Sequence, residues 1–320
     1  MLRKTMAFLR LIRFQNLVMI ALTQVLLRYF VLRHILELNG MGIELGHGPF
    51  FLVVLSTVMI AAGGYVINDY FDVRTDMINH PHSVVVDRVI KRRWAIVLHL
   101  VLTVGGVMIG MYAAWMTGYL RLAVFHISAA ILLWFYSTHF KRQLLTGNLT
   151  VSLLTAAVAF MPFLYEMGAL QRSQPGFLLE HRSAVITAFK YAWIFSIFAF
   201  ITTLAREIIK DLEDEQGDRA TGCQTMPIVW GDRSARLTAF FLLVITVLLL
   251  SFVVYNTIRW HRVLLNSSTA FIAGLLIIPL SVLSVYVLRS ERTYQYGRAS
   301  SALKAVMLAG LLYSVVFYYS

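Results

Sequence analysis

Long apolar stretches alternate with short polar segments along the whole chain. Nine of these stretches are close to the length of α-helix needed to cross a lipid bilayer. The first begins at "RFQN" and no small-residue cleavage site follows it, so we interpret it as a helix of the mature protein. We therefore expect an all-α membrane protein with one domain over residues 1–320. The predicted spans cover residues 12–33, 50–70, 94–116, 119–138, 147–166, 186–206, 236–257, 268–288 and 301–319.

Composition agrees with this pattern, and the distribution of charge adds an orientation. Hydrophobic residues make up 59% of the chain, and its mean hydropathy of +0.72 lies far above that of soluble proteins. A net charge of +12 often indicates nucleic-acid binding, but most of the 28 Lys and Arg residues fall on one side of the nine spans. This bias predicts a cytoplasmic N-terminus. The single cysteine, Cys223, excludes an internal disulfide and a cysteine-based metal site.

The pattern D-x-x-D-x-x-x-D occurs twice, in "NDYFDVRTD" and "KDLEDEQGD", each time after a long apolar segment. At 3.6 residues per turn, its three carboxylates fall within about 60° of one helix face, and Asn68 joins that face in the first copy. Two such stripes facing each other would hold Mg²⁺ and, through it, a diphosphate. We expect some aspartates to support the metal ligands rather than to touch the ion. The candidate metal ligands are Asn68, Asp69, Asp72, Asp76, Asp211, Asp214 and Asp218.

Three other interpretations of the acidic pattern are open. The acids are solvated helix ends, they are ion sites of a cation-coupled transporter, or they persist in a non-catalytic scaffold. Two copies with identical spacing argue against simple solvation. Acids of transporters usually lie near the middle of the membrane on broken helices, whereas both copies here lie at a membrane boundary.

These residues resemble the UbiA superfamily of intramembrane prenyltransferases. The family pattern N-D-x-x-D-x-x-x-D is met from Asn68 to Asp76, and its D-x-x-x-D pattern is met at Asp214 and Asp218. The similarity extends to "RFQNLVMIALTQ" in the first span, to "YSTHFKR" and "GNLT" between the fourth and fifth spans, and to "REIIKDLEDEQGDRATGCQTMP". It covers most of the chain, and the two acidic motifs together are specific.

The resemblance implies a bundle of nine helices around a central cavity, with polyprenyl diphosphate and Mg²⁺ held between the two motifs. The metal would neutralise the departing diphosphate while an acceptor attacks C1 of the prenyl chain. The implied catalytic residues are Asp72, Asp76, Asp214, Asp218 and Lys141, and the implied substrate-binding residues are Asn16, Asn68, Tyr136, Arg206 and Lys210.

Two of these basic positions have alternative interpretations. Arg206 and Lys210 lie four residues apart on one helix face, where they would bind a phosphate of the donor or of the acceptor. The alternative is that they only anchor the helix at the membrane surface. Lys141 would stabilise developing negative charge as a point donor, and its alternative is also a purely topological role.

The acceptor follows from the form of the second motif. "REIIKDLEDEQGD" is most similar to the branch that includes digeranylgeranylglyceryl phosphate synthase, which alkylates a hydroxyl of a glycerol-phosphate lipid. We therefore expect a prenylglycerol phosphate-type acceptor, with an aromatic acceptor of ubiquinone or menaquinone biosynthesis as the alternative and haem as a third choice. One departure from the family pattern leaves open which loop residues of this chain contact the diphosphate. His80, Ser83 and Val84 stand where the family often has Arg, Arg and Pro.

The remaining expectations concern partners, location and loops. The partners are the prenyl donor, a lipid or aromatic acceptor and membrane lipid, with neither nucleic acid nor an obligate protein partner. We expect a multi-pass protein of a bacterial inner (cell) membrane, with its motifs facing the cytoplasm. The polar stretches 68–93 and 206–235 are interpreted as acidic loops, and the glycine-rich run 40–46 as a flexible loop. His80 and His82 are interpreted as polar loop residues rather than metal ligands.

Overall fold

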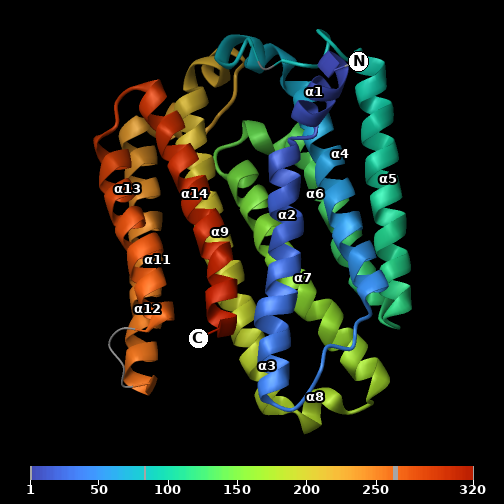
Figure 1. Ribbon diagram of the computed structural model, residues 1–320. Coiled ribbons are helices and arrows are strands. Elements are labelled where there is room, and N and C mark those ends of the chain that lie inside the picture. Colours follow the sequence, from blue (N-terminus) through green and yellow to red (C-terminus); the bar gives the residue numbers. More distant parts are fainter. Residues whose placement is uncertain (1, 83, 262–265, 320) are drawn as a thin grey trace.

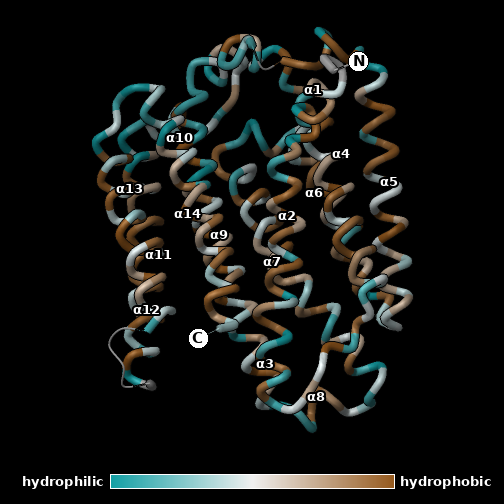
Figure 2. Tube along the Cα trace, viewed as in Figure 1, coloured by the Kyte–Doolittle hydropathy of each residue, from teal (hydrophilic) through white to brown (hydrophobic). Residues whose placement is uncertain are grey.

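A computed structural model describes residues 2–82, 84–261 and 266–319, without the side chains of residues 2–4, 260 and 261. It is a bundle of long helices that run roughly along one direction (Figure 1). Within these residues, nine helical segments are long and apolar enough to cross a membrane, as predicted. Hydrophobic residues dominate the middle of the bundle, and hydrophilic ones gather toward its two ends (Figure 2).

The spans follow the predicted order, and most of them extend further than predicted. The first is formed by α2 (Phe14–Leu26), a π-helical segment η1 (Leu27–Leu32) and α3 (Arg33–Leu38), and the eighth by α12 (Ser267–Phe271), η4 (Ile272–Ile277) and α13 (Ile278–Arg289). The others are α4 (His47–Asn79), α5 (Arg92–Met116), α6 (Ala123–Thr138, preceded by the 3₁₀ turn Leu120–Leu122), α7 (Thr146–Ser173), α9 (Arg182–Ala220), α11 (Asp232–His261) and α14 (Thr293–Tyr319).

Both motifs are helical, as their spacing predicted. The interpretation of residues 68–93 and 206–235 as loops is wrong for their first parts, since the loops begin only after Asn79 and Ala220. α4 ends at Asn79, two residues before Pro81, because a residue that precedes proline disfavours the α conformation. α9 ends at Ala220, just before Gly222, which adopts a φ of +75° that favours glycine. Polar residues on a single stripe do not interrupt a helix, and the loops begin only after these breakers.

The C-terminal ends of α4 and α9 lie at the same end of the bundle, which we call the motif end (Figure 1). The N-terminus and the short helix α1 (Leu2–Leu11) also lie there, as does α10 (Met226–Trp230). The C-terminus lies toward the opposite end, near α3, and α8 (Phe177–Glu180) closes that side. An odd number of crossings requires this separation of the termini.

Close helix packing and an apolar outer surface both fit a membrane environment. Gly63 on α4 lets α5 approach, because a Cβ there would lie 3.3 Å from the backbone oxygen of His99 and would also meet the Thr103 hydroxyl. Large apolar side chains on the other face of α5 are exposed, among them Val101 and Met108. Such a surface would be a liability in water, whereas lipid solvates it.

A buried ion pair stabilises the end opposite the motifs. Arg28 Nε lies 3.1 Å from Glu166 Oε2, and both side chains are 0% exposed. Glu166 Oε1 also accepts hydrogen bonds from the backbone N–H groups of Leu45, at 2.9 Å, and Glu44, while Arg28 donates to the Leu45 carbonyl. The run of residues 40–46 is a loop, as predicted, and it is anchored to the bundle at Glu44 and Leu45.

Candidate active site

The first aspartate stripe lies on the last turns of α4 and is held by side chains from other segments. Lys141 Nζ and Asn68 Nδ2 both donate to Oδ2 of Asp72, the amide at 2.6 Å. Arg13, which precedes α2, donates to Oδ1 of Asp69 at 3.0 Å. Burial disfavours the charge of Lys141, but the Asp72 carboxylate outweighs this effect and raises the pKa of the ammonium group above its ordinary value. A permanent positive charge therefore lies beside the stripe.

The second stripe lies on the last turns of α9. Asn148 Nδ2, from α7, donates to Oδ2 of Asp211 at 2.7 Å. His80, directly after α4, lies 2.9 Å from Oδ1 of Asp214, and this hydrogen bond raises the pKa of its imidazole. His80 is thus more than a polar loop residue, because it links the end of the first motif to the second.

Asn79, at the end of α4, connects the two stripes through the backbone. Its Nδ2 donates to the backbone oxygen of Asp214 at 2.9 Å, and its Oδ1 accepts from the N–H of Gly217 at 2.8 Å. The Thr75 hydroxyl donates to that of Thr221 at 3.1 Å, one turn away. A Cβ at position 217 would lie 2.5 Å from the Asn79 amide, so the missing side chain permits this contact.

Two aspartates remain without a hydrogen-bond or ion-pair partner in the described part of the chain, Asp76 on α4 and Asp218 on α9, whereas the other four are engaged. Asp218 lies within electrostatic reach of Asp72 and Lys141, as does Asp76. The free carboxylates therefore belong to one charged group that spans both helices.

The available oxygens suit Mg²⁺. Carboxylates are its preferred ligands, and Asn68 Oδ1 is buried without a hydrogen-bond partner, which leaves a further oxygen available. Among the described residues, no three His, Cys, Asp or Glu side chains form a ready-made metal site. Mg²⁺ typically takes one or two carboxylates and completes its coordination with water and phosphate oxygens. The stripes therefore fit Mg²⁺ that binds together with a diphosphate.

A cavity of about 770 Å³ begins beside the stripes and runs between α2, α4, α6, α7, α9 and α14. It extends along α2 from Arg13 to Leu27, roughly 20 Å at 1.5 Å per residue. Apolar side chains form most of its wall, and polar ones gather near the motif end. This shape suits a long apolar chain with a charged head group. The polar lining near the motif end consists of Arg13, Asn16, Tyr65, Asn68, Tyr136, Arg206, Glu207, Lys210 and Lys304.

All five residues predicted to bind substrate line this cavity, namely Asn16, Asn68, Tyr136, Arg206 and Lys210. Two charged lining residues inside the apolar helices, Glu207 and Lys304, were not predicted. Glu207 accepts hydrogen bonds from Arg206 at 3.1 Å and Lys210 at 3.4 Å. Lys304 donates to Asn16 Oδ1 at 2.7 Å. Lys304 lies about three turns inside α14, which begins at Thr293, and is therefore not a cation of the helix end. A charge inside an apolar helix was the signal for both residues.

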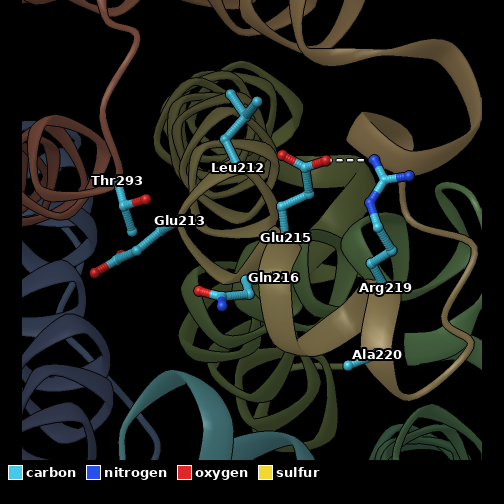
Figure 3. A pocket seen from close by; sticks show the side chains of 7 residues that line it. All are labelled: Leu212, Glu213, Glu215, Gln216, Arg219, Ala220 and Thr293. Carbon is cyan, nitrogen blue, oxygen red and sulfur yellow. Dashed lines mark hydrogen bonds and ion pairs between the residues drawn. The ribbon is translucent and has the colours of Figure 1, made fainter.

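Two acidic residues within the second motif, Glu213 and Glu215, face a different space. Glu213, Glu215 and Gln216 line a surface cleft of about 430 Å³ together with Arg219 (Figure 3). Glu215 forms an ion pair with Arg219 at 2.5 Å. Glu213 and Glu215 therefore belong to this cleft, whereas Glu207 lines the cavity of the candidate site.

The loop after the first motif departs from the family pattern, and two of its cations, Arg88 and Arg92, have partners outside the stripes. Arg88 donates to the carbonyl of Pro81 at 2.6 Å, and Arg92 lies 4.5 Å from the ring centre of Tyr70. Both are engaged within their own region rather than with an aspartate of the stripes. Ser83, one of the substituted positions, lies outside the described residues.

Comparison with known proteins agrees with this geometry. The sequence model of the UbiA prenyltransferase family matches residues 41–308. The chain belongs to this family. It is therefore a multi-pass membrane prenyltransferase, as its motifs and helical bundle predicted.

Curated relatives and solved structures extend the comparison. The chain is 31% identical to digeranylgeranylglyceryl phosphate synthase from Methanopyrus kandleri over 272 residues, which cover 85% of this chain and 88% of that protein. It is 34% identical to the enzyme of the same name from Methanothermobacter thermautotrophicus over 208 residues, 64% of this chain and 65% of that one.

The fold is also that of solved family structures. One structure, from work on digeranylgeranylglyceryl phosphate synthase in membranes, has a TM-score of 0.64 at 21% identity and covers 99% of both chains. A UbiA homologue from Archaeoglobus fulgidus, bound to DMAPP and Mg²⁺, has a TM-score of 0.54 at 17% identity, with 95% of this chain and 98% of that chain covered. At these identities the likeness establishes the fold.

Changing Gly217 to alanine is expected to lower the turnover of prenyl transfer about 10- to 100-fold, because the new Cβ displaces Asn79 and shifts Asp214 relative to α4. Turnover at saturating donor and acceptor measures this effect. Gly274→Ala is the matched control, since no atom lies within 4 Å of its Cβ position. Unchanged turnover in Gly217→Ala would mean that the Asn79 contact does not set the geometry of the stripes.

Proposed function

We propose that the protein transfers a polyprenyl group from a polyprenyl diphosphate to a prenylglycerol phosphate-type lipid, with Mg²⁺ as cofactor. The observation that carries this proposal is the position of the two aspartate stripes beside the mouth of an apolar cavity. A charged diphosphate and its cations would lie at the stripes, and the attached hydrocarbon chain would follow the cavity away from them.

Different residues of the chain would have different roles in this reaction. Asp76 and Asp218, with help from the other aspartates and Asn68, would hold Mg²⁺, which supplies positive charge to the departing diphosphate. Lys141 lies beside Asp72 and adds a fixed positive charge at the same place. The apolar wall excludes water from the reacting carbon, so that the acceptor hydroxyl rather than water forms the new bond.

The nature of the acceptor is supported by two observations. The relatives at about one-third identity bear the name of an enzyme whose product is a glycerol phosphate lipid. The cavity also carries cations beyond those that pair with the aspartate stripes, as expected for an acceptor with its own negative charge. An aromatic acceptor of quinone biosynthesis is the alternative within the same reaction class.

The orientation belongs to the proposal as well. The excess of Lys and Arg at the motif end favours a cytoplasmic location for the stripes, where phosphorylated metabolites and Mg²⁺ are found. The relatives named above come from archaea, so a bacterial inner membrane is only a prediction from the sequence and has no support from them.

Purified, lipid-reconstituted protein with labelled geranylgeranyl diphosphate is expected to label geranylgeranylglyceryl phosphate, and to do so only with Mg²⁺. The measurement is product formation against a panel that also contains 4-hydroxybenzoate and dihydroxynaphthoate, with and without a chelator. Removal of Mg²⁺ should abolish transfer, since the aspartates then repel the diphosphate. Heat-inactivated protein and longer donors serve as controls.

Each other outcome has a definite meaning. Label on an aromatic acceptor would replace the lipid acceptor while keeping the reaction class. Mg²⁺-dependent donor binding without transfer would mean that the acceptor lies outside the panel. Absence of both would contradict the proposal, and substrate uptake into the liposomes would then favour transport.

A further inference from the structure

A second polar group lies inside the cavity, apart from the aspartate stripes. Arg206, Lys210 and Lys304 approach one another from α9 and α14, and we call these three residues the cation cluster. All three line the cavity. Glu207 accepts from the two α9 cations, and Asn16 on α2 accepts from Lys304. Glu207 is thus the carboxylate that forms ion pairs with the cluster in the described part of the chain, and Lys210 also lies within electrostatic reach of Asp214 and Asp218.

The cluster carries more positive charge than the protein neutralises. Its single carboxylate, Glu207, is shared by Arg206 and Lys210. In the part of the chain that the structure describes, Lys304 has no carboxylate within ion-pair distance, and its partner Asn16 is neutral. Nε of Arg206 is buried without a hydrogen-bond partner. Because unpaired charges and donors are costly in an apolar span, this arrangement indicates a missing anion.

The missing anion is distinct from the diphosphate of the donor. Two cations beside the first stripe are already paired there, Lys141 with Asp72 and Arg13 with Asp69. Lys210 lies one turn before Asp214 and borders the second stripe. Arg206 precedes Asp214 by eight residues on the same helix, roughly 12 Å at 1.5 Å per residue, and so lies deeper in the bundle. One cavity therefore contains two regions for anions, one beside the stripes and one at Arg206 and Lys304, and Lys210 borders both.

We propose that the cation cluster binds the phosphate of the acceptor lipid, with Lys304 as a specificity-determining contact. This inference rests on the proposed function and names the residues that would select its acceptor. A phosphate monoester carries nearly two negative charges and three acceptor oxygens, which match the charge excess of the cluster and its free Arg206 donor. A carboxylate with one charge would leave part of that excess uncompensated. The contact holds the glycerol hydroxyl beside the C1 end of the donor.

Lys304→Gln tests the proposal, with Lys304→Arg as the variant that keeps the charge. Steady-state transfer is measured in liposomes with geranylgeranyl diphosphate and with two acceptors, geranylgeranylglyceryl phosphate and the phosphate-free geranylgeranylglycerol. Arg219→Gln is the matched control, because it removes a cation near the same end that lies in the separate surface cleft. Binding of each acceptor is also measured by calorimetry without donor or Mg²⁺.

We expect Lys304→Gln to raise the KM for the phosphorylated acceptor about tenfold or more and to leave the KM for the donor within about twofold. In Lys304→Gln, the preference for the phosphorylated over the phosphate-free acceptor should be lower than in the wild type by the same factor. Lys304→Arg should retain most of this preference. Arg219→Gln should behave like the wild type. In calorimetry without donor, Lys304→Gln should bind the phosphorylated acceptor more weakly than the wild type does and should bind the phosphate-free acceptor equally well. This result would support the same assignment.

Three results would overturn the proposal. An equal effect on both acceptors, or no effect, would mean that Lys304 does not recognise the phosphate. A rise confined to the KM for the donor would assign Lys304 to the diphosphate instead. Failure of the wild type to transfer label would contradict the proposed function alone, because the calorimetric comparison of the two acceptors tests the cation cluster without turnover.

Discussion

Replacing Asp72 or Asp214 with asparagine is expected to abolish measurable prenyl transfer, with a loss of at least about 10²- to 10³-fold, while the bundle stays folded. Asp72 receives hydrogen bonds from Asn68 and Lys141, and Asp214 from His80. Asparagine retains the size of the side chain but removes the charge that orders these partners and helps to attract Mg²⁺. The loss should appear in kcat and persist at high Mg²⁺ concentration.

The matched control is Glu215→Gln. Glu215 lies on the same helix as Asp214, one position away, yet it faces the separate cleft and pairs with Arg219 (Figure 3). Loss of its charge should leave transfer unchanged, which separates the effect of a particular carboxylate from the general acidity of the motif end. Mg²⁺-dependent binding of labelled donor should weaken in the two aspartate variants only. Full turnover in either variant would contradict the assignment of the stripes.

Replacing Arg28 with methionine is expected to destabilise the protein by about 3–5 kcal/mol, the largest stability effect that we anticipate. The change leaves Glu166 as a fully buried charge without its partner. It also removes the guanidinium that lies 4.3 Å from the ring centre of Phe50 and donates to the carbonyl of Leu45. The loss is measured as the change in the free energy of unfolding in detergent, from thermal or denaturant unfolding curves.

Two controls separate the broken pair from a simple loss of charge. Arg28→Met combined with Glu166→Gln should recover part of the stability, because the glutamine oxygen still accepts from the N–H of Leu45 and no buried charge remains. Arg33→Met breaks an exposed pair with Glu37 on α3 and should leave stability unchanged. Equal stability of Arg28→Met and the wild type would mean that the pair contributes nothing to the fold.

The sequence predicted the fold well because hydropathy reports directly on membrane crossing. Each predicted span coincides with a helix, and the errors lie at the ends. α4 and α9 continue through their polar motifs to Asn79 and Ala220, since helix geometry tolerates a polar stripe and ends only at a true breaker. The glycine-rich run 40–46 is a loop, as predicted, but the sequence did not indicate what holds it. Its composition indicates a loop, but the anchor that holds it, Glu166, lies far away in the chain.

The candidate site was predictable in part. Helical spacing alone places the aspartates on one face, and the family resemblance adds Lys141 and Arg206. Neither indicates which carboxylates remain free, because Asp72 and Asp211 are engaged by residues from other segments, Lys141 and Asn148. A partner on another helix has no signature in the local pattern.

The sequence by itself therefore determined the membrane location, the number of spans, the two aspartate stripes and the reaction class, all of which depend on local periodicity and short motifs. Only the tertiary structure decided that Asn79 joins the stripes, that Asp76 and Asp218 have no side-chain partner among the described residues, and that Lys304 reaches the cavity to meet Asn16. The physical reason is that helix packing brings together side chains from distant parts of the chain. The pairing of charges inside an apolar bundle then depends on that packing rather than on the order of the residues.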